Sequence, residues 1–318
     1  MTWLVTGGAG YIGAHVVRAL TQDGQDVVVL DDLSTGTPDR IVEGVRFVEG
    51  SLLDAQALAE AMQGVTGVVH IAAKKQVGES VAEPLHYYRE NLDGLLTLLE
   101  ACRDRGVDRF VFSSSAATYG MPDVDLVTED TPKEPLSPYG ETKLVGEWLL
   151  SDCATAFGLR AMSLRYFNVA GAATPQLGDP GVFNLVPLVF QALAKGERPR
   201  VFGNDYPTPD GTCIRDYVHV ADVADAHLAA ARALDAGARG ATYNIGRGTG
   251  SSVLEVIDVI GQVTGLDVSY DVVGRRPGDP ARVVASVDRI TEGLGFQAKH
   301  DLRQMVESAW AGWRLRHG

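Results

Sequence analysis

The chain has 318 residues, 45% of them hydrophobic, and a formal net charge of −13 at pH 7. This length allows two domains or one large α/β unit with a sizeable core. The negative charge argues against nucleic acid or an anionic membrane as a partner, because both are negatively charged themselves. No apolar run approaches the ~18 residues of a membrane helix. Cys102, Cys153 and Cys213 show no C-x-x-C spacing, which predicts reduced thiols in a cytoplasmic protein, and the histidines show no metal-ligand spacing.

The first thirty-two residues predict a dinucleotide-binding unit. An apolar strand at residues 3–5 leads into Gly7-Gly-Ala-Gly10-Tyr-Ile-Gly13, and a helix and a second strand at residues 26–30 follow. The glycines allow a tight turn and a close approach to a pyrophosphate, which binds at the helix N-terminus. Asp31 and Asp32 follow the second strand, with Asp31 18 residues after Gly13. An acid there binds the adenosine ribose and repels a 2′-phosphate, so NAD is favoured over NADP.

The alternation of strands and helices continues and predicts a doubly wound parallel sheet of the Rossmann type. Further strands are expected at residues 45–48, 67–71 and 109–112, with a helix at residues 54–63. A long helix is expected after Pro84, with Leu92, Leu95, Leu96 and Leu99 on one buried stripe. Ligands of such sheets bind beyond the carboxyl ends of the strands, so Ala72, the serines 113–115 and the helix that begins near Tyr139 should border the binding crevice.

Ser137-Pro138-Tyr139-Gly140-Glu141-Thr142-Lys143 is the stretch that carries the chemistry. Proline ahead of an apolar-periodic run marks a helix start, so Tyr139 and Lys143, four residues apart, lie on one helix face. A phenol is a poor base at neutral pH, but a nearby ammonium lowers its pKa. The pair therefore predicts proton abstraction from an alcohol, with Ser115 placed to join it. The same spacing would also fit a solvated helix face.

The second half predicts a smaller mixed α/β unit. Residues 170–181 read as a crossing loop, followed by helices at 184–195 and 222–234, the latter with Asp222 and Asp225 on a solvated face. Residues 242–245 are expected to return as a strand to the main sheet, Ser252 and Glu255 to form a capping box, and residues 302–315 to form the final helix. Two domains are predicted. The NAD-binding domain consists of residues 1–170, with segments near 216–246 that return to it. The substrate-binding domain consists of residues 171–215 and 247–318.

Four further motifs are typical of one particular protein family. They are Tyr11-Ile-Gly13, Val77-Gly-Glu-Ser80, Ser113-Ser-Ser-Ala-Ala-Thr-Tyr-Gly120 and Arg165-Tyr-Phe-Asn168. With the Y-x-x-x-K pair and the segment from Phe202 to Val220, they resemble the UDP-glucose (UDP-galactose) 4-epimerase family of the extended short-chain dehydrogenase/reductase superfamily, over almost the whole chain. By this resemblance Ser115 and Tyr139 contact the sugar O4, and Lys143 holds the nicotinamide ribose.

The resemblance also implies the cofactor contacts. They are Gly7, Gly10, Tyr11, Ile12, Gly13, Asp31, Asp32, Ser51, Leu52, Ala72, Lys75, Asn91, Ser113, Tyr139, Lys143 and Phe167. Asn91 supports the active site in the superfamily. Ser51 stands where many relatives place an aspartate against the adenine, so this contact departs from the family pattern.

A second set of residues is implied for the UDP-sugar. It consists of Ser115, Tyr139, Asn168, Asn184, Leu185, Phe202, Arg215, Arg276, Asp279 and Val283. Arg215 and Arg276 would clamp the diphosphate, a role that suits guanidinium groups in an acidic protein. Phe202 would lie by the uracil and Asp279 at the uridine ribose. Val283 stands where a bulky tyrosine is associated with plain hexoses, so it predicts tolerance of N-acetyl groups; alternatively, it packs against the fold.

The predicted reaction is NAD-dependent 4-epimerisation of a UDP-hexose through a transient 4-keto sugar. UDP-glucuronate 4-epimerisation is the main alternative. A dehydratase or decarboxylase should carry an acid after the active-site serine, where Ala116 and Ala117 stand. A non-catalytic NAD-binding protein should have lost the tyrosine or the lysine. The expected partners are a UDP-sugar and a second copy of the chain in a homodimer.

Overall fold

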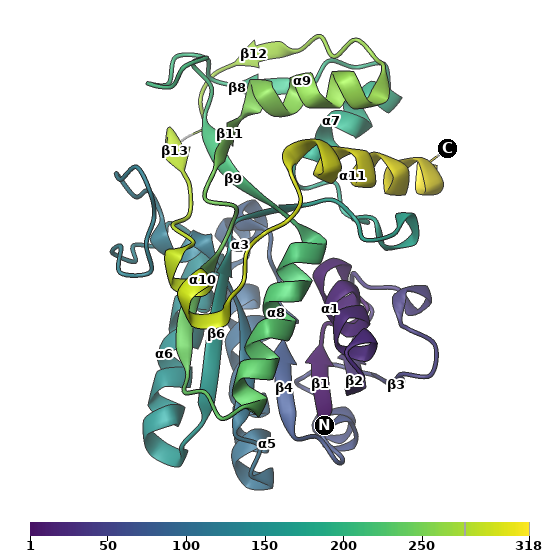
Figure 1. The fold of residues 1–318 in the computed structure, drawn as a ribbon, viewed down its shortest axis with the longest axis vertical. Helices are drawn as coiled ribbons and strands as arrows, with labels where there is room; N and C mark the ends of the chain where they lie inside the picture. Colours follow the sequence, from purple (N-terminus) through teal and green to yellow (C-terminus); the bar gives the residue numbers. More distant parts are fainter. Residues whose placement is uncertain (277, 318) are drawn as a thin grey trace.

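A parallel seven-stranded sheet forms the base of the computed structural model, which describes residues 1–276 and 278–317 (Figure 1). In spatial order its strands are β10 (Ala241–Ile245), β6 (Arg160–Tyr166), β5 (Arg109–Ser115), β4 (Gly67–His70), β1 (Thr2–Thr6), β2 (Asp26–Asp31) and β3 (Arg46–Glu49). Strand β10 pairs with β6, as the sequence predicts, although the paired residues, such as Ala241 and Met162, are 79 positions apart along the chain. The doubly wound α/β prediction is confirmed.

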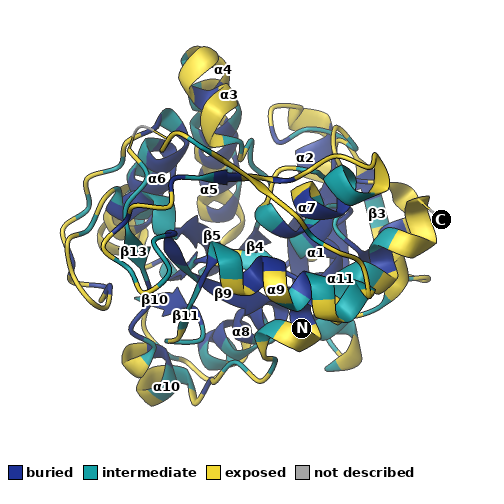
Figure 2. Cartoon of the chain, turned by 90° about the horizontal axis from the view of Figure 1, so that it is seen from above, coloured by how far each residue is buried: buried dark blue, intermediate teal, exposed yellow. Residues whose placement is uncertain are grey.

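Two helical layers cover the sheet because its strands are apolar on both faces. One layer contains α2 (Ala55–Ala61), α5 (Gly94–Arg105) and α6 (Pro138–Phe157); the other contains α1 (Tyr11–Gln22), α8 (Val220–Asp235) and α10 (Asp288–Leu294) (Figure 2). Leu4, Val28 and Phe110 point into the first core, and Val5, Val29 and Val111 into the second. This alternation along each strand explains the nearly continuous hydrophobic runs.

The helix expected after Pro84 is not continuous. It divides into α4 (Pro84–Tyr88), a π-helical turn η2 (Arg89–Asp93) and α5. The predicted stripe is partly wrong, because Leu96 is 44% exposed whereas Leu98 is fully buried. The wider turn places the Asn91 side chain inside the protein, where it makes three hydrogen bonds. This local change of period is what the sequence pattern misses.

The predicted solvated face of α8 is also wrong in part. Asp222 is completely buried, and its two carboxylate oxygens accept hydrogen bonds from the backbone N–H and the ring Nδ1 of His300. Asp225, three residues further along the helix, pairs with Lys299 as a surface acid does. The partner of Asp222 is 78 residues away in the sequence, so the helix pattern alone carries no signal for it.

A smaller unit lies above the carboxyl ends of the main strands (Figure 1). Its strands are β7 (Asn168–Ala170), β9 (Ile214–His219), β11 (Gly250–Ser252) and β13 (Arg282–Val283), with a separate pair, β8 (Arg200–Phe202) and β12 (Asp271–Val273). Its helices are α7 (Leu185–Ala194), α9 (Val253–Thr264) and α11 (Leu302–His317), which share one apolar core. Helix α9 begins with the predicted capping box of Ser252 and Glu255.

Short helices make up the remaining connections. They are η1 (Pro38–Arg40), α3 (Val77–Ala82), η3 (Ala116–Tyr119) and η4 (Pro175–Leu177). The loop around η4 joins the two units and is held from the sheet side by two buried side chains. Tyr11 OH donates to the Gly171 carbonyl at 2.5 Å, and the Arg40 guanidinium donates to the carbonyls of Leu177 and Gly178.

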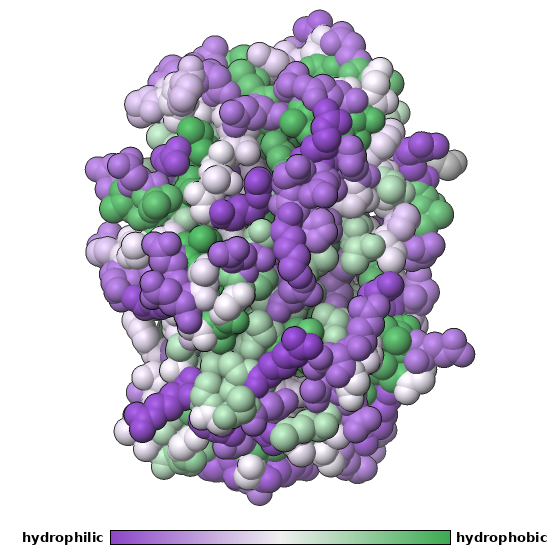
Figure 3. All heavy atoms as spheres, in the orientation of Figure 1, coloured by the Kyte–Doolittle hydropathy of each residue, from purple (hydrophilic) through white to green (hydrophobic). Residues whose placement is uncertain are grey.

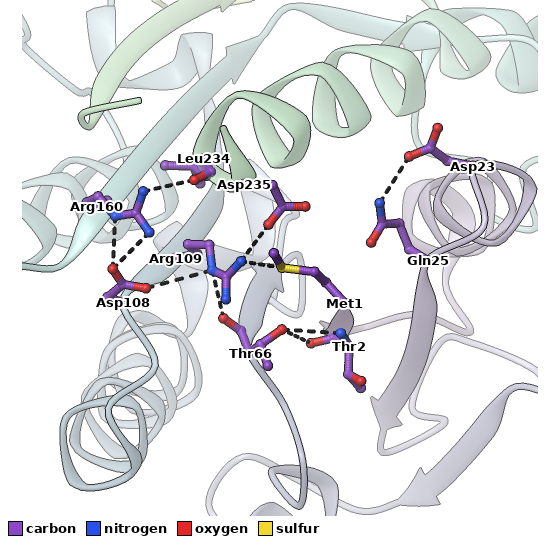
Figure 4. Close-up of polar contacts among 10 residues, drawn as sticks. All are labelled: Met1, Thr2, Asp23, Gln25, Thr66, Asp108, Arg109, Arg160, Leu234 and Asp235. Carbon is purple, nitrogen blue, oxygen red and sulfur yellow. Dashed lines mark hydrogen bonds and ion pairs between the residues drawn. The ribbon is translucent and has the colours of Figure 1, made fainter. Parts of the chain in front are cut away.

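At the amino ends of the strands, away from the smaller unit, ion pairs connect the sheet to the neighbouring helix α8 (Figure 4). Arg109 pairs with Asp235 at 2.7 Å, and Arg160 pairs with Asp108 at 2.8 Å. These contacts join the starts of β5 and β6 to the end of α8. A hollow of about 480 Å³ beside Gln25 and Arg46 also lies at the amino ends of the strands. It is therefore remote from the carboxyl ends of the strands, where a sheet of this type binds its ligands.

Hydrophilic side chains dominate the face of the molecule drawn in Figure 3, and apolar ones form small separate areas. The 41 acidic and 28 basic residues of the chain supply hydrophilic side chains of this kind. Among the described residues, no helix is both long enough and apolar enough to span a membrane.

Candidate active site

The predicted proton-abstracting residues meet at the carboxyl ends of β5 and the start of α6. Ser137 caps α6, its Oγ accepting from the Gly140 N–H at 3.2 Å, and Pro138 occupies the first turn. Tyr139 and Lys143 then project from one face, and they are only 7% and 3% exposed. Strand β5 runs three residues further than predicted, to Ser115, because its serines pair with β6.

Lys143 is fixed by the strand rather than by the phenol. Its Nζ donates to the Ser113 carbonyl at 2.8 Å and lies 5.0 Å from the centre of the Phe112 ring. Burial lowers the pKa of Lys143 to about 7, and the carboxylate of Glu147 opposes that change. Both the carbonyl and the ring face stabilise an ammonium.

The electrostatics of Tyr139 differ from the prediction. Burial raises the pKa of this phenol, and only a hydrogen bond with Ser115 lowers it. Lys143 is not among the groups that lower this pKa, and burial lowers the pKa of Lys143 itself to about 7, so the lysine offers less positive charge than an exposed ammonium would. The spacing of Tyr139 and Lys143 therefore does not by itself account for a lowered pKa of the phenol.

The glycine-rich turn has the close packing that a pyrophosphate-binding loop requires. Gly7 has a φ of +73°, and a Cβ there would lie 2.8 Å from the backbone nitrogen of Ala72. A Cβ on Gly13 would lie 1.9 Å from the Gly7 carbonyl oxygen. Gly10 is the N-cap of α1 and has no side chain that could accept a hydrogen bond. The first backbone N–H groups of α1 are therefore not capped by a side chain and can bind an anion. Ile12 packs into the core beneath.

Asp31 shapes this loop from the end of β2. Its carboxylate accepts from the Ala9 N–H at 2.9 Å and from the Leu33 N–H at 2.8 Å. Burial raises its pKa. Asp32 is exposed and accepts from the Ser34 N–H. Both acids lie where the sequence places them, but Asp31 already has two backbone partners, so it serves as a structural support for the glycine turn as well.

The other predicted cofactor residues fall into two groups. Asn91 is buried and joins the loop after β4 to α6, through the Lys74 backbone and through Thr142 Oγ1 at 3.0 Å. Ser113 is buried and its Oγ lies 2.8 Å from His227 Nε2. In contrast, Lys75 is exposed, the Ser51 hydroxyl accepts from the Leu53 N–H within its own turn, and Leu52 belongs to the core.

A second group of predicted residues gathers around Cys213 in the smaller unit. Arg215 forms an ion pair with Asp279. The Arg276 guanidinium lies 3.7 Å from the centre of the Phe202 ring. The charges of Arg215, Asp279 and Arg276 all act on the Cys213 thiol, whose pKa is raised chiefly by burial. These residues come from β8, β9 and the 274–281 segment, so the fold brings three distant stretches together.

The remaining predicted substrate residues are more dispersed. Asn184 is exposed at the start of α7, where its side chain makes no capping hydrogen bond, and Leu185 is half-buried beside it. Asn168 is exposed at the start of β7. Val283 lies opposite Arg215 in the β9–β13 pair and packs on a small apolar cluster that contains Phe167. That cluster also reaches Ala116, the residue after Ser115.

Sequence reasoning missed several side chains of this site. Tyr166, from β6, stands opposite Ser115 in the β5–β6 pair, and its pKa is raised strongly, chiefly by burial and further by Tyr139. Glu147 and Arg165 form a buried ion pair at 2.5 Å, with 8% and 4% of their side chains exposed. The signal for Glu147 was present, because it stands four residues after Lys143 on the same helix face.

Comparisons with known proteins agree over nearly the whole chain. Residues 3–246 match the NAD dependent epimerase/dehydratase family. The curated UDP-glucose 4-epimerase of Corynebacterium glutamicum is 45% identical over 98% of this chain and 95% of its own length. That of Azospirillum brasilense is 48% identical over 96% of this chain and 90% of its own.

Two solved structures show the same similarity in three dimensions. The UDP-glucose 4-epimerase from Stenotrophomonas maltophila, with bound NAD and formylated UDP-arabinopyranose, has a TM-score of 0.95 at 42% identity, covering 99% of this chain and 98% of that chain. The UDP-Glc/GlcNAc 4-epimerase from Campylobacter jejuni has a TM-score of 0.88 at 37% identity, covering 99% of each chain.

Proposed function

We propose a function from one premise: the chain belongs to the NAD dependent epimerase/dehydratase family, and its curated relatives are UDP-glucose 4-epimerases. The protein is an isomerase that uses NAD to invert C4 of a UDP-hexose. The observation that carries this assignment is the meeting of Ser115, Tyr139 and Lys143 at the carboxyl edge of a sheet whose first turn is a dinucleotide-binding loop.

Side chains of the protein transfer the proton of the sugar 4-hydroxyl. In the proposed reaction Tyr139, as phenolate, accepts the proton of the sugar 4-hydroxyl, and Ser115 orients that hydroxyl. When bound, NAD⁺ supplies the reversible oxidation at C4, which makes the 4-keto sugar transient and leaves the cofactor unchanged over a cycle. Lys143 holds the nicotinamide ribose and contributes positive charge beside the phenol.

The residues present fit a dinucleotide. The Gly7–Gly13 turn leaves its backbone open at the N-terminus of α1, and the bulk of any side chain at Gly13 is excluded by the 1.9 Å approach to Gly7. We propose that this turn holds the pyrophosphate, that Asp31 and Asp32 hold the adenosine ribose, and that Asn91 acts by holding the loop after β4. Ser51 and Lys75 would contact the cofactor from the rim.

The UDP-sugar is proposed to bind in the smaller unit. Arg215 and Arg276 offer guanidinium groups to the diphosphate, and Phe202 offers a ring to the uracil. Asp279 would then take the uridine ribose, so its ion pair with Arg215 has to loosen. The residues at the starts of β7 and α7, Asn168, Asn184 and Leu185, would line the sugar side.

Tolerance of N-acetyl sugars is the finer part of the proposal. Val283 is half-buried and shares an apolar cluster with Phe167 and Ala116, and Ala116 directly follows Ser115, which supports a place for Val283 near the sugar. A small residue there leaves room for an acetamido group, since packed sites absorb added volume poorly. The similarity to a UDP-Glc/GlcNAc 4-epimerase supports this inference.

We also propose which domain binds which ligand, and that the protein forms a homodimer. Residues 1–170, with 216–246 returning, would hold NAD, while 171–215 and 247–318 hold the substrate. Leu96 on α5 and Trp148 on α6 are 44% and 58% exposed, and they are suited to contact a second copy in a homodimer. The three free cysteines support a cytoplasmic protein. Light scattering of the purified protein tests the dimer.

Product analysis tests the function. Purified protein is incubated separately with UDP-glucose, UDP-N-acetylglucosamine and UDP-glucuronate, and the sugars are resolved by chromatography. The proposal predicts UDP-galactose from the first and an N-acetylgalactosamine product from the second, with no net gain of NADH. Stoichiometric NADH, or activity on UDP-glucuronate alone, would contradict it.

A further inference from the structure

Glu147 lies one turn beyond Lys143 and two turns beyond Tyr139 on the same face of α6. Its Oε1 accepts from the Ser114 hydroxyl at 2.5 Å and from Arg165 Nε at 2.8 Å, and its Oε2 accepts from Arg165 Nη2 at 2.5 Å. Ser114 and Arg165 are themselves paired across β5 and β6, next to the pair of Ser115 and Tyr166. One carboxylate therefore ties the helix of the phenol to the two strands that end at the site.

Arg165 extends this network away from the site. Its Nη1 donates to the Tyr119 hydroxyl at 2.7 Å and to the Glu129 carbonyl at 3.2 Å, and Tyr119 donates in turn to Asn244 Oδ1 at 2.7 Å. Within the described residues, no buried polar atom of Glu147 or Arg165 lacks a partner. The pair is thus held in one geometry by β5, β6, β10 and η3.

Stability alone does not explain such a pair. A buried ion pair can usually be replaced by apolar residues without loss of stability, because the desolvation of two charges offsets their attraction. Its position suggests another use, since the other groups around Lys143 in the described part of the chain carry no negative charge. These are the neutral ring of His70 from β4, Phe112 and the Ser113 carbonyl from β5, and Tyr139 on its own helix.

We propose that Glu147, oriented by Arg165, is a positioning residue that keeps Lys143 charged beside Tyr139 and fixes the strand end that carries Ser115. This inference rests on the proposed function, and in it Glu147 acts on Tyr139 only through Lys143. The neighbouring Arg165 partly neutralises Glu147, so the orientation of the carboxylate matters as well as its charge. Burial lowers the pKa of Lys143 to about 7, and Glu147 is the group that raises it.

The main test is Glu147→Gln in the holoenzyme. Losing the carboxylate should lower the pKa of Lys143, so the alkaline fall in kcat/KM should move to lower pH, by about one unit given the effect of a nearby charge. At pH 8 kcat should drop about tenfold or more, while KM for UDP-glucose stays within about threefold. An unshifted pH profile would overturn the proposal, even with lowered kcat, because a purely structural role moves no titration.

Two further variants separate charge from packing. Glu141→Gln makes the same change on the same helix, where Glu141 accepts from Tyr88 on another face, and it should leave the profile unchanged. Glu147→Asp keeps the charge but shortens the side chain, so it should recover most of the pH profile while kcat stays reduced. If Glu147→Asp matches Glu147→Gln in its profile, charge is not the cause and the proposal fails.

Glu147→Gln leaves a buried arginine without its partner, which can prevent folding. In that event the double variant Glu147→Gln/Arg165→Gln decides, because it removes both buried charges together. It should also show the shift to lower pH, since the orienting contact and the negative charge beside Lys143 are both gone. A wild-type profile in the double variant would overturn the proposal.

A measurement that needs no catalytic turnover tests the role of Glu147 separately from the proposed function. The ultraviolet absorbance of the Tyr139 phenolate is titrated in the holoenzyme, each protein being compared with its own Tyr139→Phe counterpart. The phenol should ionise at higher pH in Glu147→Gln than in the wild type. If the wild type binds NAD but epimerises nothing, the function fails, and the phenolate titration still supports or refutes the role of Glu147.

Discussion

Lys143 Nζ donates a 2.8 Å hydrogen bond to the carbonyl of Ser113, two residues before Ser115 on the same strand. The ammonium is therefore anchored to β5, and the phenol four residues earlier on α6 is brought to the same strand end. The carboxyl end of β5 and the start of α6 are therefore joined through Lys143, which places Tyr139 beside the strand that carries Ser115.

Replacing Tyr139 by phenylalanine should abolish proton transfer and little else. The ring is retained, so bound NAD and the affinity for UDP should be close to wild type. The turnover should fall by about 10²–10⁴-fold, the contribution of general acid–base catalysis. Steady-state kinetics and a fluorescence titration of UDP measure both. A kcat near the wild-type value would show that Tyr139 is not the base.

The stability of the cofactor-free protein should depend on pH through Lys143. Burial lowers its folded-state pKa from 10.5 to about 7, so between those values the unfolded chain binds a proton that the folded chain does not. The free energy of unfolding therefore rises with pH over this window, by at most about 1.4 kcal/mol per unit. Lys143→Met lacks the group and should lack this rise.

Urea unfolding at pH 7, 8 and 9 measures the effect. The difference in free energy of unfolding between wild type and Lys143→Met should change steadily in favour of the wild type as the pH increases. Other titrating groups cancel in this difference. Parallel curves for the two proteins would mean that Lys143 keeps an ordinary pKa in the folded chain.

The strands were the most predictable part of the fold, because residues such as Val5 and Val29 form short apolar runs between turn residues. The identities of Tyr139, Lys143 and Ser115 could be proposed because their spacing has a chemical meaning. The buried state of Asp222 could not, since it depends on His300. The π-helical turn at Asn91 was equally hidden, because contacts with Lys74 and Thr142 stabilise it.

The electrostatics of the site was the least predictable feature. The spacing of Tyr139 and Lys143 indicates proximity, but it does not show that burial raises the pKa of the phenol and lowers that of the lysine. That outcome depends on His70, Phe112 and Glu147, which come from three elements. A pattern of residue types predicts which groups meet, whereas their protonation is decided by everything packed around them.

Substitution of Val283 by tyrosine should change the choice of sugar. The added ring is expected to fill the space of an acetamido group, so kcat/KM should fall for UDP-N-acetylglucosamine and stay close to wild type for UDP-glucose. Val283→Ala is the matched control and should keep both activities. The ratio of the two kcat/KM values is the measurement. If Val283→Tyr leaves this ratio unchanged, Val283 only packs against the fold near Phe167.

The central claim is that C4 is oxidised and reduced again within one active site. UDP-glucose labelled with deuterium at C4 tests it most directly, with the UDP-galactose product examined by NMR and mass spectrometry. The account predicts that the deuterium is retained at C4 of the inverted product and that none exchanges with the solvent. Loss of the label to water would mean that C4 is inverted by removal of a proton, and it would contradict the proposed roles of NAD and Tyr139.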